Sequence, residues 1–189
     1  MNIVCRNKKI FDKENAREKL TAWLGVDYGT RFFEPHYCAI KRKIIAEKFI
    51  EEIDGGLNDY KVHCFNGKAK FIQTIGNRDL VTQEGNQNFY DFSWNDIGWT
   101  FEDYPNFPNP VFRPACLEEM KRCAEVLSSD FSYVRLDFYE INKKLLFGEA
   151  TFTPRGGNYP YIRTWTREKD LELGSFMTLP SEKYKFWEH

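Results

Sequence analysis

Several features that would assign this chain to a common class are missing from its sequence. It contains no apolar run of about 18 residues, the length that a membrane-spanning helix needs. Residues 1–10 have no apolar core of the kind found in signal peptides. The five cysteines are odd in number and include no CxxC pair, which excludes a zinc finger and a complete disulfide framework. These absences predict a soluble, cytoplasmic protein without a membrane span.

The sequence also lacks a surplus of charge and the common catalytic motifs. Its 27 basic and 28 acidic side chains nearly cancel, whereas proteins that bind nucleic acid without regard to sequence usually carry a basic surplus. No Ser/His/Asp or Cys/His set has a recognisable context, and no Asp-x-Asp triplet occurs. We therefore expect no nucleic-acid partner and no nucleophilic side chain.

What is present is enough apolar material for a folded domain. Hydrophobic residues make up 42% and aromatic residues 17% of the chain, which argues against disorder. We predict one α+β domain over residues 1–189, with antiparallel strands, packed helices and a long ordered loop at about 76–114. The predicted elements are a helix from Lys13 to Gly25 capped by Asp12, a strand over 44–50, a hairpin of 59–65 with 69–75, a helix over 115–128, and a hairpin of 133–141 with 145–152.

The second hairpin places charged residues opposite each other. Side chains alternate between the two faces of a strand, so Arg135 shares a face with Asp137, and Glu149 shares a face with Thr151. A three-residue turn at 142–144 would pair Asp137 directly with Glu149, with Cβ atoms roughly 4.5–5.5 Å apart. Two carboxylates at that separation repel each other unless a proton or a cation lies between them.

A divalent cation is one solution to this repulsion. Mg²⁺ binds carboxylate and phosphate oxygens in an octahedron, and Thr151 could add a neutral oxygen or hold a water. Arg135 would then face a phosphate or a developing oxyanion. The alternative is an ordinary exposed sheet face on which Arg135 neutralises one carboxylate. A two-residue turn would shift the register and remove the direct pairing.

The first half of the chain holds two weaker candidates. The segment 47–50 (Glu-Lys-Phe-Ile) suits a hinge that receives an adenine ring, although by itself the pattern favours an amphipathic segment with Phe49 in the core. Lys61 interrupts an apolar alternation on the same face as Asp59, so it needs an anionic partner. Arg78, beyond the next strand, could join Lys61 as a phosphate ligand, although both could also be solvated surface charges.

Five stretches, taken in order, resemble one known family. They are NIVCRNK, IIAEKFIEE, LNDYKVHCFNGKAKFIQ, NFYDFSW and DFSYVRLDFYEINKKLLFGEATFTPRGG. This ordered set resembles the TupA-like ATP-grasp family, which is associated with bacterial surface-polysaccharide gene clusters. The resemblance runs to about residue 180.

The resemblance implies an ATP-grasp-like fold, ATP and Mg²⁺ as cofactors, and a role for each candidate. The implied roles are adenine binding for Glu47, Lys48, Phe49 and Ile50, ribose binding for Glu52 or Asp54, phosphate contacts for Lys61 and Arg78, Mg²⁺ ligation for Asp137 and Glu149, and stabilisation of the acyl phosphate for Arg135. At Thr151 most ATP-grasp enzymes carry Asn. The amino-terminal part of the grasp fold, with its Gly-rich loop, has no counterpart here. Three explanations are open: the chain is a fragment of a longer protein, a partner chain supplies the missing part, or nucleotide binding is weak or lost.

The implied reaction is the ATP-dependent joining of a carboxylate to an amine through an acyl phosphate, in cell-surface polysaccharide biosynthesis. The substrates would be a small-molecule or saccharide carboxylate, such as a uronic acid, and an amine such as an amino acid, or the reverse. One alternative is a non-catalytic, truncated ATP-grasp module that binds nucleotide or serves as a partner subunit. Another is a glycosyltransferase, which such gene clusters also encode, but the missing Asp-x-Asp triplet counts against it.

Overall fold

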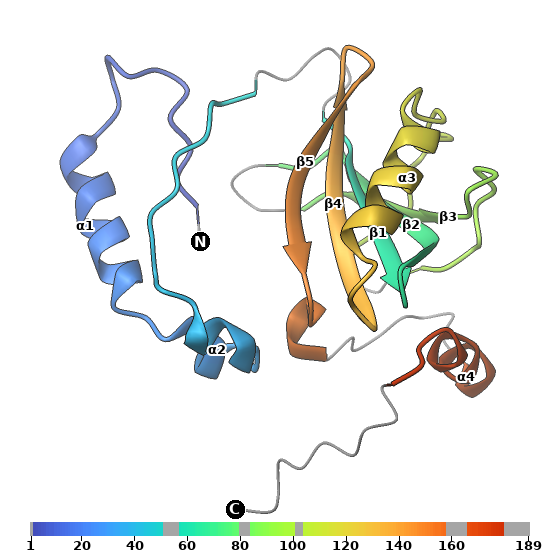
Figure 1. Cartoon of the computed structure of the whole chain (residues 1–189). Helices are drawn as coiled ribbons and strands as arrows, with labels where there is room; N and C mark the ends of the chain where they lie inside the picture. Colours follow the sequence, from blue (N-terminus) through green and yellow to red (C-terminus); the bar gives the residue numbers. More distant parts are fainter. Residues whose placement is uncertain (1, 51–56, 80–83, 101–103, 158–165, 180–189) are drawn as a thin grey trace, which may run out of the picture. The chain divides into compact units, whose positions relative to one another are not determined.

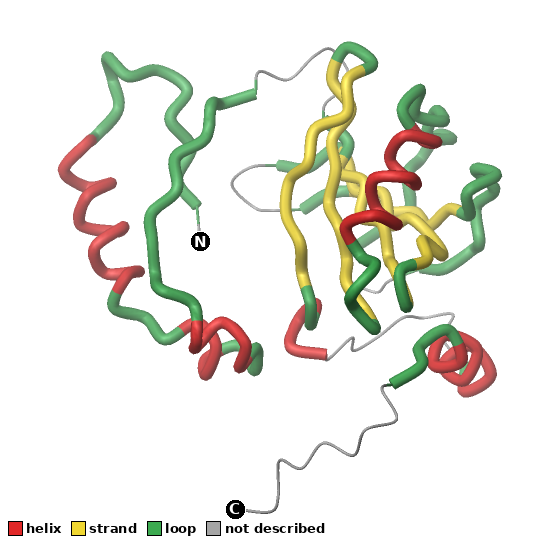
Figure 2. Tube along the Cα trace, in the orientation of Figure 1, coloured by secondary structure: helices red, strands yellow, loops and turns green. Residues whose placement is uncertain are grey.

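The computed structural model of the chain describes residues 2–50, 57–79, 84–100, 104–157 and 166–179 (Figure 1). Helices occur together with one antiparallel sheet in these ranges (Figure 2), which confirms the α+β class. None of the helices described there is long and apolar enough to cross a membrane. The described residues form two compact units. One comprises 2–50 with 155–157, and the other the described residues between 57 and 154 with 166–179.

The first unit is built from short helices. α1 (Lys13–Leu24) begins after Asp12, whose carboxylate accepts a 3.0 Å hydrogen bond from the backbone N–H of Asn15, and it ends at Gly25 as predicted. Three shorter turns follow, α2 (Tyr28–Arg31), η1 (Pro35–Ala39) and η2 (Pro154–Gly157). The Glu34 carboxylate accepts a 3.4 Å hydrogen bond from the Gly156 backbone N–H, which ties the returning chain to this unit.

The predicted strand over 44–50 is wrong. Residues 41–50 are all described and form no helix or strand. Ile44 and Ile45 are exposed, and only Phe49 and Ile50 are half-buried. The apolar run alone suggested a buried strand, but a strand forms only where another strand satisfies its backbone groups.

The second unit is organised around a five-stranded antiparallel sheet. Its strands are β1 (Asp59–Phe65), β2 (Lys68–Gly76), β3 (Asn86–Tyr90), β4 (Tyr133–Ile141) and β5 (Lys144–Thr151), in the spatial order β3-β2-β1-β4-β5 (Figure 1). β3 was not expected and lies within the segment 76–114, where the sequence shows little periodicity. Its residues read Asn-Gln-Asn-Phe-Tyr, so three polar side chains hide the strand from an analysis of hydrophobic pattern.

Both predicted hairpins form. The β1–β2 hairpin turns at Asn66 (φ 47°) and Gly67 (φ 72°), and the β4–β5 hairpin at Asn142 (φ 52°) and Lys143 (φ 59°). Positive φ at both central residues is the conformation that matches the twist of two-residue hairpins. The second turn therefore has two residues and not the predicted three, and Ile141 pairs with Lys144.

A bulge restores the register that the shorter turn would have shifted. Phe138 pairs with Phe147 while Asp137 pairs with Glu149, so Gly148 is the extra residue on β5. A Cβ at Gly148 would lie 2.9 Å from the Tyr139 ring and 3.2 Å from the Asp137 carbonyl oxygen. The predicted pairing of Asp137 with Glu149 is thus confirmed, although for a different structural reason.

The two faces of the sheet are packed differently. α3 (Leu117–Leu127), close to the predicted 115–128, covers one face and buries Leu117, Met120 and Ala124 in its core. The other face carries a second apolar cluster at one end, in which Phe176, after α4 (Arg167–Ser175), packs on Phe65 with ring centroids 5.7 Å apart. Most of the remaining side chains on this second face are polar, with the apolar Ile75 among them, and they contain the candidate site.

Candidate functional site

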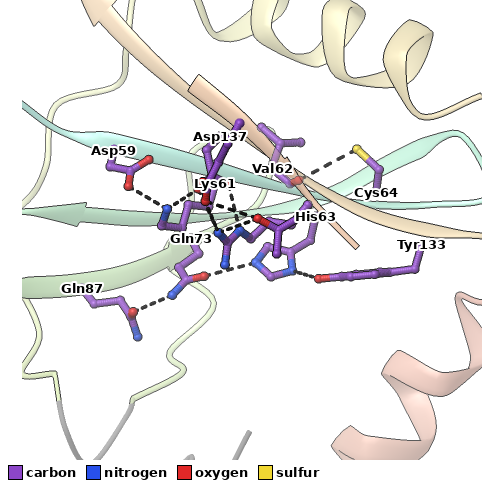
Figure 3. A network of polar contacts seen from close by, with 12 residues as sticks. Asp59, Lys61, Val62, His63, Cys64, Gln73, Gln87, Tyr133 and Asp137 are labelled. Atoms are coloured by element: carbon purple, nitrogen blue, oxygen red, sulfur yellow. Dashed lines mark hydrogen bonds and ion pairs between the residues drawn. The ribbon is translucent and has the colours of Figure 1, made fainter. Parts of the chain in front are cut away.

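The site lies on the face of the sheet opposite α3, around the central strand β1. Tyr60, Val62 and Cys64 belong to the core that α3 covers, so the alternation of the strand sends Asp59, Lys61 and His63 to the other face. Lys61 stands directly opposite Asp137 on β4 and Gln73 on β2, and Asp137 stands opposite Glu149 on β5. Three strands therefore bring together the charges shown in Figure 3.

Lys61 is buried between two carboxylates. Its ammonium lies 2.6 Å from Asp59 Oδ2 and also pairs with Asp137 Oδ2. The side chains of Lys61, Asp59 and Asp137 are exposed by only 9%, 9% and 2%. Lys61 therefore has the anionic partner that its position requires, and a second one on β4 that the sequence did not reveal.

The two carboxylates beside Lys61 respond differently to this environment. Burial raises the pKa of Asp137, but the Arg135 guanidinium and the Lys61 ammonium outweigh it, and the net effect is a lowered pKa. Burial also raises the pKa of Asp59, and here the opposing charges of Lys61 and Arg78 do not compensate. Asp137 is thus the better stabilised anion of the two.

Arg135 occupies the centre of the predicted metal site. Its Nε and Nη2 donate to Asp137 Oδ1 and Oδ2 at 2.8 and 2.9 Å, a bidentate pair. The same Nη2 donates to Glu149 Oε1 and to Thr151 Oγ1, both at 3.0 Å. One guanidinium therefore pairs with both carboxylates, whereas the exposed sheet face considered in the sequence analysis would have it pair with only one of them.

These contacts bring four of the predicted residues to one place. Asp137, Glu149 and Thr151 supply only oxygen atoms, the donors that Mg²⁺ prefers. Within the described ranges no group of three or more His, Cys, Asp or Glu side chains is arranged to hold a metal. The two carboxylates and the hydroxyl thus form a partial set of ligands, already bridged by Arg135.

A chain of buried polar side chains continues from this cluster across the sheet. Tyr133 lies 2.9 Å from His63 Nδ1, His63 Nε2 lies 3.2 Å from Gln73 Oε1, and Gln73 Nε2 donates to Gln87 Oε1 at 2.6 Å (Figure 3). Burial, aided by the Arg135 charge, lowers the pKa of His63 to about 3, so the imidazole is neutral. The histidine also stacks on Phe71, with ring centroids 4.4 Å apart.

His63 is buried within this chain of side chains. The glutamines beside it were not predicted from the sequence. A signal was present in retrospect, because Gln73 and Gln87 take core-facing positions that strands normally fill with apolar residues.

The remaining predicted residues lie elsewhere in the chain. Arg78 follows β2 and is near enough to Asp59 for its charge to lower the pKa of that carboxyl. Glu47 and Lys48 are exposed in the first unit, and Phe49 lies 5.4 Å from the guanidinium of Arg6 in that unit. Glu52 and Asp54 lie outside the described residues.

Comparison with known proteins gives one result. Residues 1–178 match the family described as TupA-like ATPgrasp. No curated protein and no solved structure matches the chain. Since the match covers nearly the whole sequence, including all strands of the site, the chain belongs to the TupA-like ATP-grasp family.

Proposed function

We propose that this protein is an ATP- and Mg²⁺-dependent ligase that joins a carboxylate to an amine through an acyl phosphate. The observation that supports the proposal is the direct opposition of Asp137 and Glu149, which a bulge at Gly148 maintains in a member of an ATP-grasp family. Cell-surface polysaccharide biosynthesis, with a uronic acid and an amino acid as substrates, is the corresponding biological setting.

The side chains fit a magnesium ion in their chemistry. Asp137, Glu149 and Thr151 would hold it, and when bound it would supply positive charge for the phosphate oxygens of ATP. Mg²⁺ usually keeps several waters and needs only one or two carboxylates beside the phosphates, so the two carboxylates here suffice. Because Arg135 donates to all three residues, its guanidinium has to exchange some of these contacts when the ion binds.

The basic side chains of the chain would then stabilise charge during the reaction. In the first step a substrate carboxylate attacks the terminal phosphate of ATP and ADP leaves; in the second step the amine attacks the acyl carbon and inorganic phosphate leaves. Arg135, once released from Glu149, presents a planar fork to the oxyanion that forms in either step. Lys61 holds Asp137 in place through their ion pair, and catalysis consists of positioning and electrostatic stabilisation.

One observation favours a second candidate, a non-catalytic ATP-grasp module. Arg135 already pairs with both Asp137 and Glu149, so each carboxylate has a cationic partner without any ion. A protein that had kept the fold but lost the reaction would retain such a cluster as a structural element. The adenine hinge at 47–50 and a partner chain that supplies a Gly-rich loop remain parts of the proposal for either candidate.

The deciding experiment is a calorimetric titration of the whole chain with a non-hydrolysable ATP analogue, with and without Mg²⁺. We expect binding that depends on magnesium, and we expect Asp137→Asn and Glu149→Gln each to abolish it while circular dichroism stays unchanged. Asp130→Asn and Glu118→Gln, at exposed positions, are the matched controls and should bind as the unmodified chain does.

Release of inorganic phosphate from ATP then separates the two candidates. A ligase releases phosphate only when a carboxylate and an amine are both present, and pairs of uronic acids with amino acids are the first to test. Magnesium-dependent binding without turnover for any pair supports the module. Unchanged nucleotide affinity in both carboxylate variants refutes the metal assignment for either candidate.

A further inference from the structure

Three buried polar atoms beside the charged cluster have no hydrogen-bond partner within the described part of the chain. They are Asp59 Oδ1, Gln87 Nε2 and Arg78 Nε. The residues Asp59 and Gln87 are only 6% and 3% exposed. A buried polar atom without a partner destabilises the folded state, and native proteins keep few of them. Three in one region indicate a ligand that completes their hydrogen bonds.

The sheet places these three residues next to one another. Asp59 on β1 and Gln87 on β3 both pair with Ile75 on β2, so they flank that residue in one row across three strands. Neighbouring strands lie about 4.8 Å apart, which puts the two backbones about 10 Å apart. Arg78, just beyond the end of β2, is near enough to act electrostatically on both Asp59 and Tyr139. The buried side chain of Ile75, 5% exposed, lies between them on the same face, so a ligand that contacts both Asp59 and Gln87 has to lie over Ile75.

The hydrogen bonds of Gln73 determine which side-chain atom of Gln87 is left without a partner. Gln73 directs its carbonyl oxygen to His63 and its amide nitrogen to the carbonyl oxygen of Gln87. The oxygen of Gln87 is thereby used, and only its N–H₂ group remains. Gln87 is therefore held as a donor, and its ligand has to offer an acceptor.

Asp59, in contrast to Gln87, is left as a hydrogen-bond acceptor. Its Oδ2 is paired with the Lys61 ammonium at 2.6 Å, which leaves Oδ1 as a buried acceptor. The Lys61 charge is shared between Asp59 and Asp137, so the negative charge on Asp59 is only partly neutralised. A cationic donor is the group that best completes it, since hydrogen bonds between charged groups are roughly twice as strong as neutral ones.

We infer that Asp59, Gln87 and Arg78 form the subsite for the amine substrate, and that this substrate is an α-amino acid bound as a zwitterion. Its ammonium group donates to Asp59 Oδ1, and its carboxylate accepts from Gln87 Nε2 and Arg78 Nε. A single anionic acceptor close to a cationic and a neutral donor matches the two charged ends of such a molecule. The inference rests on the proposed function, because it decides which of the two substrates is the amino acid.

The test begins with a thermal-shift screen of the standard amino acids against the whole chain, with and without Mg²⁺ and the ATP analogue. The amino acid that stabilises the chain most is then titrated calorimetrically beside its N-acetyl and α-amide derivatives. We expect each derivative to bind about tenfold or more weakly, because each removes one charged hydrogen bond. Asp59→Asn should weaken binding about tenfold and Gln87→Leu about fivefold, while Asp130→Asn should have no effect.

Three results would overturn the inference: no amino acid binds in either condition, the N-acetyl or amide form binds as tightly as the parent, or a folded Asp59→Asn variant keeps the full affinity. If Asp59→Asn does not fold, the derivatives still decide the question on the unmodified chain. Nucleotide binding without amino-acid binding refutes only this inference. Amino-acid binding without nucleotide binding supports the subsite and refutes the ligase.

Discussion

Replacing Lys61 by methionine should destabilise the protein by about 3–5 kcal/mol, the usual cost of removing one partner from a buried ion pair. The side chain is only 9% exposed and pairs with Asp59 and Asp137, whose side chains are 9% and 2% exposed. Methionine has a similar length, so the loss of charge and not a cavity dominates the effect. With a denaturant dependence of about 2 kcal/mol per molar urea, the unfolding midpoint should fall by about 2 M.

The pH dependence of this loss provides a second signature. Without the ammonium, the buried carboxylates of Asp59 and Asp137 repel each other, and their pKa values in the folded state rise. A raised pKa contributes stability that is present below the unfolded value, about 3.9, and is lost as pH rises through the folded value. The difference between the Lys61→Met variant and the unmodified chain should therefore shrink as the pH falls from 7 toward 4.

Two controls accompany this measurement. Lys68→Met changes a lysine on β2 whose side chain is 70% exposed, and its effect should stay within about 0.5 kcal/mol. In an Asp137→Asn background, Lys61→Met should cost less than it does alone, because the two residues share one interaction. The reasoning is refuted if Lys61→Met costs no more than Lys68→Met at neutral pH.

Two further predictions concern the frame of the site. Gly148→Ala should destabilise the protein by about 1–3 kcal/mol, because the new methyl group would lie 2.9 Å from the Tyr139 ring and 3.2 Å from the Asp137 carbonyl oxygen. Urea unfolding measures this loss of stability. An effect as small as that of Lys68→Met would contradict the prediction. The pKa of His63 is lowered to about 3 in the folded protein, whereas an unfolded histidine has a pKa of about 6.5. Its neutral form therefore stabilises the folded state above pH 6.5. As the pH falls below 6.5, this stability is lost by up to about 1.4 kcal/mol per pH unit. His63→Gln should flatten the dependence of the free energy of unfolding on pH between 6.5 and 4, and an unchanged slope would contradict the assignment.

The sequence predicted the parts of the site that depend on local signals. Asn66-Gly67 and Asn142-Lys143 define two hairpins, and the period of the strands places Asp137 and Glu149 on one face. The direct pairing of these carboxylates was predicted from a turn of the wrong length, and Gly148 compensates for the difference. Turn length and bulge position together determine a register, and the pattern of side chains reveals neither of them alone.

The contacts between distant segments could not be predicted in this way. Lys61 and Asp137 are 76 positions apart, and nothing in either strand specifies that β1 pairs with β4. β3 was missed because its polar residues form hydrogen bonds inside the protein, where an alternating pattern would be apolar. One of these polar residues, Gln87, belongs to the proposed amine subsite.

The central position of β1 has a consequence for the order in which the protein assembles. β1 and β2 are joined by a two-residue turn, whereas β4 arrives only after a long intervening segment. Closing a long loop costs more chain entropy than closing a short hairpin, and non-local pairings form more slowly. We therefore expect Lys61 to meet Asp59 first during folding, and Asp137 and Arg135 to join when β4 docks. Interactions that form late chiefly slow unfolding. The carboxylate that is proposed to hold the metal is then also expected to slow the unfolding of the sheet.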